Sequence, residues 1–246
     1  MNPDQQGHRR VALVFGGSRG IGAGIVERLA KEGFDVALTY VSRPDAAQAT
    51  LGAVEAAGRR GLAIQADSAD PVAIRAAVAE AVERLGPLDA VVVNAGVLRH
   101  GTIDVLSIED LDLLLNVNVR GVYLAIQAGV ASLRDGGRVI TIGSNTAIRT
   151  GMAGNSVYAM TKAAVAAMVQ NLALDLAPRR ITINNVQPRP IATDMTAPFA
   201  EHLQDKLKLG RMGQPHEIGA LVAYLAGPES GYMTGASLTI DGGWVL

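Results

Sequence analysis

Short runs of β-branched and aliphatic residues alternate along this chain with longer stretches whose apolar residues recur at helical spacing. We predict seven strands, at residues 11–15, 35–41, 61–65, 88–94, 137–143, 181–187 and 237–240. We predict helices between them, at residues 20–31, 45–57, 71–85, 108–133, 156–177 and 215–225. Strands that alternate with helices form parallel sheets, and these strands lack the polar alternation of a half-exposed sheet. The pattern therefore predicts a doubly wound α/β fold, in which helices cover both faces of a seven-stranded parallel sheet.

The composition is that of one large folded domain. Hydrophobic residues make up 49% of the 246 residues and charged residues 18%, which is enough apolar material for an extensive core. No linker rich in proline, glycine or serine interrupts the alternation, so we expect residues 1–246 to form a single domain. The formal net charge is −1, without blocks of like charge. This balance argues against nucleic acid and against an anionic membrane surface as partners.

Several missing features narrow the class of protein further. The chain has no cysteine, which excludes disulfides and thiol nucleophiles. Its 4 histidines lack metal-ligand spacing, so no metal is predicted. Residues 1–10 lack the apolar stretch of a signal peptide, and no unbroken apolar run approaches the ~20 residues of a membrane span. We therefore expect a soluble, cytoplasmic protein with no membrane partner.

A glycine-rich turn connects the first predicted strand to the first predicted helix. Its sequence is Gly16-Gly17-Ser18-Arg19-Gly20-Ile21-Gly22. Glycines in a strand–turn–helix context let backbone N–H groups approach a pyrophosphate, which also lies at the positive end of the helix. The spacing differs from the commonest dinucleotide-binding fingerprint, so a purely structural turn is the alternative at this point.

The end of the second predicted strand indicates which nicotinamide cofactor such a turn would hold. NAD-binding sites place a carboxylate there to bind the ribose hydroxyls. This strand ends without one, at Tyr40-Val41-Ser42-Arg43. Arg19 and Arg43, together with the Ser42 hydroxyl, offer the charge-assisted contacts that a 2′-phosphate prefers. The residues favour NADP over NAD, with a solvated Arg43 as the alternative.

Tyr158 and Lys162 stand four residues apart in a predicted helix and therefore share one face of it. A phenol of pKa about 10 is a poor acid or base at neutral pH, and a neighbouring ammonium would lower that pKa toward a useful value. Such a pair is common on helix surfaces, so its neighbours decide its meaning. Ser144 ends the fifth predicted strand, where its hydroxyl can reach a substrate carbonyl oxygen. Asn118 adds a buried amide that could hold a water beside Lys162, and an ordinary helix-capping or helix-bending residue is the alternative.

One irregular stretch, residues 188–213, follows the sixth predicted strand and carries three prolines, Pro188, Pro190 and Pro198. Ligands of open α/β sheets bind beyond the carboxyl ends of the strands. The stretch is therefore placed to act as a lid over a binding site, and a packed surface loop is the alternative.

Together these motifs resemble the short-chain dehydrogenase/reductase family, near its ketoacyl-carrier-protein reductase and bacterial carbonyl reductase branch, over nearly the whole chain. The matching residues are Gly16, Gly20 and Gly22, Asp67, Asn94-Ala95-Gly96, Asn118-Val119-x-Gly121, Ser144, Tyr158-x-x-x-Lys162, Asn184 to Pro188 with Thr193, Thr234-Gly235, and Asp241-Gly242-Gly243. The resemblance implies a Rossmann fold, a homotetramer, and interconversion of an alcohol and a carbonyl with NADP(H), NAD(H) remaining open. It implies that Tyr158 is the acid and base, that Ser144 polarises the carbonyl, that Lys162 also binds the nicotinamide ribose, and that Asn118 anchors a proton-relay water.

The resemblance also implies the residues that bind ligands, with Asp67 at the adenine, Asn94 beside the adenine ribose, and Thr193 and the backbone near Ile191 at the nicotinamide carboxamide. The expected cofactor residues are Gly16, Ser18, Arg19, Gly20, Ile21, Gly22, Tyr40, Ser42, Arg43, Asp67, Ser68, Asn94, Ala95, Gly96, Tyr158, Lys162, Pro188, Ile191 and Thr193. The expected substrate residues are Ser144, Thr146, Met152, Asn155, Tyr158, Met195 and Phe199. Their mostly apolar character favours a small neutral ketone or aldehyde.

Three residues depart from the family pattern, namely Phe15, Val93 and Arg189. We interpret Phe15 and Val93 as packing changes. Arg189 replaces a glycine beside the expected nicotinamide, so its guanidinium would need either a pyrophosphate partner or an exit to solvent. These departures keep open the alternative of a nucleotide-binding regulator that retains the fold, and an NAD-linked alcohol dehydrogenase is a further alternative.

Overall fold

A single seven-stranded parallel sheet forms the centre of the molecule. The structure is a computed structural model that describes residues 9–149, 152–197 and 207–246. The strand order is β3-β2-β1-β4-β5-β6-β7, so the order reverses between β1 and β4. The strands are β1 (Arg10–Phe15), β2 (Phe34–Tyr40), β3 (Gly61–Gln65), β4 (Leu88–Val93), β5 (Leu133–Ile142), β6 (Thr182–Pro188) and β7 (Ser237–Ile240). The predicted doubly wound, Rossmann-type fold is confirmed, and ligands of such sheets bind where the order reverses.

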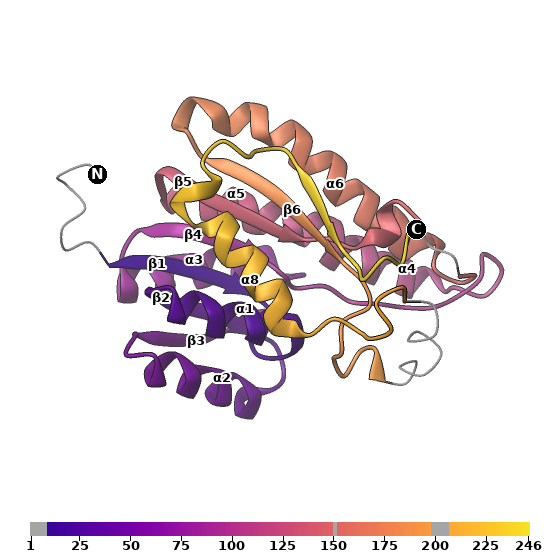
Figure 1. Ribbon diagram of the computed structural model, residues 1–246, viewed down its shortest axis with the longest axis horizontal. Coiled ribbons are helices and arrows are strands. Elements are labelled where there is room, and N and C mark those ends of the chain that lie inside the picture. The colour runs from indigo at the N-terminus through magenta and orange to yellow at the C-terminus, as the bar shows by residue number, and fades with distance from the viewer. Residues whose placement is uncertain (1–8, 150–151, 198–206) are drawn as a thin grey trace.

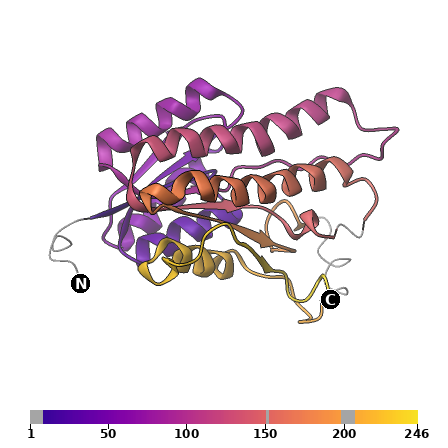
Figure 2. The same cartoon turned by 90° about the horizontal axis from the view of Figure 1, so that it is seen from above.

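Helices cover both faces of the sheet (Figures 1 and 2). One face carries α1 (Gly20–Lys31), α2 (Pro44–Ala56) and α8 (Pro215–Ala226). The other carries α3 (Pro71–Leu85), α4 (Ile108–Leu115), α5 (Val122–Ser132) and α6 (Ser156–Leu176). Consecutive residues of β1 alternate between the two cores, with Leu13 and Phe15 in one and Ala12 and Val14 in the other. The continuous apolar strands thus arise because each face of the sheet is buried.

The helix predicted at residues 108–133 is interrupted in its middle. α4 and α5 are joined by a π-helical turn, Asn116–Gly121, which contains Asn118. At its end Gly121 packs directly on the backbone, since a Cβ at this position would lie 2.2 Å from the Ser68 carbonyl oxygen. π-Helical turns of this kind are frequent at functional sites. A second difference is that β5 begins at Leu133, four residues before the predicted strand.

Two helical stretches are long and apolar enough to span a membrane by length and composition alone, Ile108–Ser132 and Ser156–Arg179. The expectation that no unbroken apolar run approaches that length concerns a different property, since both stretches contain charged residues such as Glu109 and Lys162. Core helices of soluble proteins meet the same criterion, and both stretches bury apolar residues such as Ile126 and Val169 against the sheet. They are weak evidence for a membrane partner.

The described ends of the predicted lid are bound to each other. Ile191 forms an isolated parallel bridge with Gly213, and the Ala192 N–H donates to the Gly213 carbonyl over 2.8 Å. Both ends lie beyond the carboxyl ends of the strands, on the side where the C-terminus also lies (Figure 1). Residues 198–206, including Phe199, lie outside the described residues, so the covering role remains a prediction.

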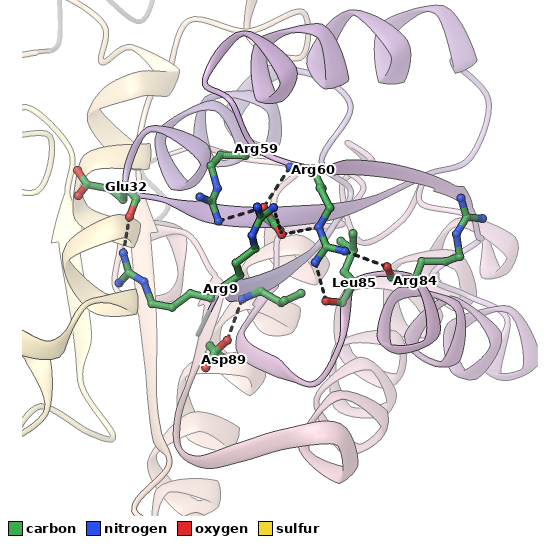
Figure 3. Close-up of polar contacts among 10 residues, drawn as sticks. Arg9, Glu32, Arg59, Arg60, Arg84, Leu85 and Asp89 are labelled. Atoms are coloured by element: carbon green, nitrogen blue, oxygen red, sulfur yellow. Dashed lines mark hydrogen bonds and ion pairs between the residues drawn. The ribbon is translucent and has the colours of Figure 1, made fainter. Parts of the chain in front are cut away.

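A buried carboxylate lies at the opposite, amino end of the sheet. Asp35, near the start of β2, is 0% exposed and accepts hydrogen bonds from the backbone N–H of Arg60 over 3.1 Å and from its Nε over 2.7 Å. Arg59 Nη2 lies 3.1 Å and Arg9 Nη1 4.0 Å from its oxygens. The side chains of Arg59 and Arg60 converge from two directions (Figure 3). Burial acts to raise the pKa of Asp35, but the hydrogen bonds of Arg60 and the charge of Arg59 outweigh it and lower that pKa.

Candidate active site

The glycine turn between β1 and α1 has backbone geometry that only glycine adopts readily. Gly16 and Gly20 have φ angles of 74° and 53°. A Cβ on Gly22 would lie 2.0 Å from the Gly16 carbonyl oxygen. Arg19 occupies the N-cap of α1 without a side-chain cap hydrogen bond, so the helix end is free to receive an anion. These features fit a pyrophosphate.

Neighbouring strand ends hold this turn in place. The Gly16 N–H donates to Thr39 Oγ1 at the end of β2 over 3.0 Å. Asn94 Nδ2, just after β4, donates to the Gly16 carbonyl over 2.7 Å, and Ala95 packs against Gly16. Thr39 was missed by the sequence analysis, although a hydroxyl within an apolar strand was a usable signal. Asn94 and Ala95 thus lie beside the glycine turn, and the position of Asn94 beside the adenine ribose stays a prediction.

Arg19 and Arg43 both have acidic partners that the sequence analysis did not foresee. Arg19 Nη1 lies 3.6 Å from Asp194 of the predicted lid, and Arg43 Nη2 lies 3.1 Å from Asp45. All four side chains are more than half exposed. Exposed pairs of this kind contribute little stability. Both guanidinium groups thus have exposed partners that a competing anion could displace, and their contact with a 2′-phosphate stays a prediction.

The remaining predicted cofactor residues also lie at the carboxyl ends of the strands. Thr193 lies against the turn, since a Cβ on Gly20 would be 3.2 Å from Thr193 Cγ2. Asp67 is exposed after β3 and accepts from the Ala69 N–H over 2.8 Å. The others lie in the glycine turn or at strand ends: Ser18, Ile21, Tyr40, Ser42, Ser68, Gly96, Pro188 and Ile191.

Tyr158, Ser144 and Lys162 come together at the carboxyl end of β5. The Ser144 and Tyr158 side chains are hydrogen-bonded to each other. Ser144 Oγ also accepts from the Thr146 N–H over 3.2 Å, which fixes the hydroxyl at the start of a short 3₁₀ turn. Lys162 is 4% exposed, and its Nζ donates to the Ile142 carbonyl over 3.0 Å. The structure thus unites three of the four residues predicted to be catalytic.

The electrostatics of this group differ from the sequence prediction. Burial raises the pKa of the Tyr158 hydroxyl, while the Ser144 hydrogen bond and the charge of Arg189 act in the opposite direction. Lys162 Nζ lies 5.7 Å from the centre of the Tyr158 ring, and burial lowers its own pKa to about 8. The expected lowering of the Tyr158 pKa is wrong for the protein without ligands, because desolvation dominates there.

Asn118 fastens the loop after β4. Its Oδ1 accepts from the Val97 N–H and its Nδ2 donates to the Val97 carbonyl, each over 2.9 Å. A Cβ on Gly96 would lie 3.4 Å from Asn118 Oδ1 and 3.5 Å from Lys162 Nζ, so both side chains meet at this glycine. Because its amide is engaged with Val97, the side chain positions the loop beside Lys162, and a water-holding role stays a prediction.

Two further predicted substrate residues contact the groups at this place, since Thr146 donates to Ser144 Oγ and Met152 lies against Arg189. Four of the six buried side-chain polar atoms without a hydrogen-bond partner in the described residues belong to this end of the sheet, namely Asn145 Oδ1, Thr146 Oγ1, Asn155 Oδ1 and Arg189 Nη1, and the other two are Arg59 Nε and Thr182 Oγ1. Buried polar groups are normally paired, so this concentration indicates a place where a ligand completes the hydrogen bonding. Met195 is 48% exposed in the predicted lid. The predicted substrate residue Phe199 lies outside the described residues.

Arg189 does not extend into solvent, which was one of the two courses expected for it, and a pyrophosphate partner stays a prediction. Its guanidinium stacks on Trp244, with Cζ 4.8 Å from the ring centre, and Nη2 lies 3.5 Å from Met152 Sδ. The side chain is half-buried and its charge reaches the Tyr158 hydroxyl. Trp244 is not among the residues that the sequence predicted for the site, although a lone tryptophan was a signal.

Comparisons with known proteins agree with this geometry. The family model described as "Enoyl-(Acyl carrier protein) reductase" matches residues 16–245. The "Cyclic-di-GMP-binding biofilm dispersal mediator protein" of Escherichia coli (strain K12) is 41% identical over 236 residues, 95% of this chain and 96% of that protein.

Solved structures are similar over almost the entire chain. A short-chain dehydrogenase/reductase from Serratia marcescens BCRC 10948 is 50% identical, with a TM-score of 0.94 over 97% of this chain and 100% of that one. A short chain dehydrogenase from Burkholderia cenocepacia J2315, solved in complex with NADP, is 47% identical, with the same TM-score and the same shares covered. With the fold, the glycine turn and the Ser144, Tyr158 and Lys162 cluster in place, these matches show that the chain belongs to the short-chain dehydrogenase/reductase family.

Proposed function

We propose that this protein is an NADPH-dependent oxidoreductase that reduces a ketone or aldehyde to an alcohol. The observation that carries the proposal is the hydrogen-bonded pair of Ser144 and Tyr158 beside the buried Lys162. The glycine turn would hold the pyrophosphate of the cofactor, Arg19 and Arg43 its 2′-phosphate, and Lys162 its nicotinamide ribose. The Burkholderia relative solved with NADP supports this choice of cofactor.

The chain supplies the proton and the polarisation of the carbonyl. A bound nicotinamide would supply a hydride to the carbonyl carbon. Since burial raises the pKa of Tyr158, its hydroxyl is protonated at neutral pH and is ready to donate to the carbonyl oxygen. The Ser144 hydroxyl, fixed by the Thr146 N–H, donates a second hydrogen bond to the same oxygen as negative charge develops on it. The Lys162 ammonium then stabilises the phenolate that remains.

Replacement of the proton donor tests the proposal. Tyr158→Phe removes only the hydroxyl, so we expect carbonyl-dependent NADPH oxidation to fall by roughly 10³-fold, as for loss of a general acid. Tyr232→Phe serves as the matched control, since Tyr232 is fully exposed and its loss should leave turnover unchanged. The measurement is NADPH absorbance over a panel of ketones and aldehydes, with cofactor binding followed separately. Equal turnover by wild type and Tyr158→Phe would remove Tyr158 from the mechanism.

A second candidate function is binding of a signalling nucleotide without redox turnover. It is favoured by the Escherichia coli relative, which is described as binding cyclic-di-GMP. Against it, binding alone needs no hydrogen-bonded Ser144 and Tyr158. Calorimetric titration with cyclic-di-GMP, in the presence and absence of NADPH, separates the candidates. Micromolar binding together with no turnover on any carbonyl would favour the regulator.

We extend the proposal to a homotetramer. Large apolar side chains remain exposed along α5 and α6, with Tyr123 at 45%, Met160 at 49% and Leu174 at 75%. Exposed apolar surface on neighbouring helices is typical of an interface. Light scattering coupled to gel filtration measures the mass directly, and we expect about four times the 25.5 kDa of one chain. A mass of one chain would contradict the assembly.

A further inference from the structure

Arg189 places a positive charge beside the reacting groups, with no acidic partner in the part of the chain that the structure describes. No carboxylate oxygen of the described residues lies within 4.0 Å of the guanidinium, and the acids Asp194, Asp45 and Glu217 pair with other arginines. Its nearest contacts are instead the Trp244 ring and the Met152 sulfur, which are both uncharged. Nη1 is buried and has no hydrogen-bond partner among these residues. A buried guanidinium N–H without an acceptor is costly to keep, so the arrangement favours a ligand that provides one.

The place of Arg189 in the fold separates it from the phosphate-binding groups. It follows β6 directly and acts electrostatically on the Tyr158 hydroxyl. The glycine turn is faced by Thr193, and Arg19 lies near Asp194. The guanidinium therefore serves the end of the site where the carbonyl reacts, rather than the end where the cofactor phosphates would lie.

Its contacts also fix its direction. Stacking on Trp244 holds the guanidinium plane, and Met152 occupies the side of Nη2. A planar guanidinium held in this way is suited to a carboxylate, because its N–H groups match the two oxygens of that group. A small neutral ketone would leave Nη1 unpaired.

We propose that Arg189 is a specificity-determining residue that binds a carboxylate of the substrate, so that the enzyme reduces oxo acids in preference to neutral ketones. This inference rests on the proposed function, since it names the class of carbonyl compound that the same site reduces. The substrate carbonyl lies between Ser144 and Tyr158, and its carboxylate reaches Arg189. The expectation of a neutral substrate came from the apolar character of the other lining residues and gave no weight to this charge.

Matched substrate pairs test the inference. The 2-, 3- and 4-oxo acids pyruvate, acetoacetate and levulinate are each compared with their methyl esters, which keep the carbonyl and lose the charge. We expect wild type to favour at least one acid over its ester by roughly tenfold to hundredfold in kcat/KM, as for one charge-assisted hydrogen-bonded pair. In Arg189→Met that ratio should fall toward one, mainly through a higher KM for the acid, while Arg189→Lys should keep part of it. Arg28→Met removes an exposed arginine elsewhere and should keep the ratio of wild type.

The chain carries its own binding reporter, since its 1 tryptophan is Trp244, on which Arg189 stacks. Titration of the NADP⁺-saturated protein with oxo acid allows no reduction, and we expect a saturable change in Trp244 fluorescence that esters and Arg189→Met do not give. Equal binding and equal kcat/KM for acid and ester in wild type would overturn the role of Arg189. Absence of turnover on every acid, ester and ketone, with the fluorescence change still present, would instead overturn the proposed function.

Discussion

Buried charged side chains occur at both ends of the sheet, with oppositely charged partners at one end and without them at the other. At the amino ends of the strands, Asp35 is surrounded by Arg59, Arg60 and Arg9, so the buried carboxylate is compensated within the chain (Figure 3). At the carboxyl ends, Lys162 and Arg189 are cations with no ion pair in the described residues. Lys162 has a backbone carbonyl as its partner, and Arg189 has an aromatic ring and a sulfur.

The difference has opposite consequences for folding. Ion pairs and hydrogen bonds favour the ionised form of a buried carboxylate, and they lower the pKa of Asp35 accordingly. An uncompensated cation opposes folding. The pKa of Lys162, lowered from 10.5 to about 8, corresponds to about 3 kcal/mol against folding near neutral pH, at about 1.4 kcal/mol for each unit of pKa. Residues that oppose folding are typical of sites that a ligand completes.

The largest effect should come from removing the uncompensated lysine. Lys162→Met keeps the length of the side chain and removes the charge, so we expect NADPH-dependent turnover to fall by roughly 10³-fold, because the phenolate of Tyr158 loses its cation. The free energy of unfolding at pH 7 should not fall, since relief of the buried charge offsets the lost hydrogen bond to Ile142. Turnover and urea unfolding measure the two effects. Lys31→Met at the exposed end of α1 is the control, and it should change neither.

Removing the compensated carboxylate should show the opposite pattern. Asp35→Ala leaves arginines gathered around an apolar methyl group, and we expect a loss of about 3 kcal/mol in the free energy of unfolding. Asp135→Ala, which removes the partner of Arg179 at an exposed pair, should cost under about 1 kcal/mol. The remaining folded Asp35→Ala protein should keep its turnover, because the cluster lies at the opposite end of the strands. If Asp35→Ala lost turnover and kept its free energy of unfolding, the Asp35 cluster would serve the reaction and not the stability of the fold.

The two ends should also respond to different ranges of pH. The pKa of Asp35 is lower in the folded state, so its stabilisation is present above about pH 4 and is lost as the pH falls below that value. The pKa of Lys162 is also lower in the folded state, but there the neutral form is favoured. The buried ammonium lowers the free energy of unfolding fully below about pH 8, and this cost is relieved as the pH rises from 8 toward 10.5.

Unfolding curves across pH, each compared with its variant, separate these contributions. The advantage of wild type over Asp35→Ala should shrink toward pH 3. The difference between Lys162→Met and wild type should shrink between pH 8 and 10. A constant difference in either series would show that the residue does not titrate as inferred.

The sequence predicted the fold because both signals of the fold are local. Each strand is a continuous apolar run and each helix a periodic one, and β1 and α1 followed from residues within a few positions of each other. The π-helical turn at Asn118 was not predicted, and its end lies where Gly121 packs against the backbone of Ser68, a contact between residues far apart in sequence. The candidate site followed from motifs, but its charges did not. The fold brings Asp194 to Arg19 and Trp244 to Arg189. No spacing in the sequence predicts these contacts, because the partners are far apart along the chain or in different elements.

The smallest effect concerns Arg19, a cation at the ligand end that does have a carboxylate within reach. Its pair with Asp194 is exposed and 3.6 Å long, so it differs both from the buried Asp35 cluster and from the unpaired Arg189. If Arg19 binds a 2′-phosphate, Arg19→Gln should weaken NADPH binding by roughly tenfold and leave NADH binding nearly unchanged. Asp194→Asn should strengthen NADPH binding slightly, since it removes the anion that competes with the phosphate.

Dissociation constants from cofactor fluorescence, with Arg28→Gln as the control at an exposed pair elsewhere, give both ratios. Equal loss for NADPH and NADH would mean that Arg19 recognises a group that the two cofactors share, such as the pyrophosphate. Tighter binding of NADH than NADPH by wild type would favour the NAD-linked dehydrogenase. A selective loss for NADPH would instead show that an exposed pair can be exchanged for a ligand, whereas the Asp35 cluster at the other end of the sheet cannot be opened without unfolding the chain.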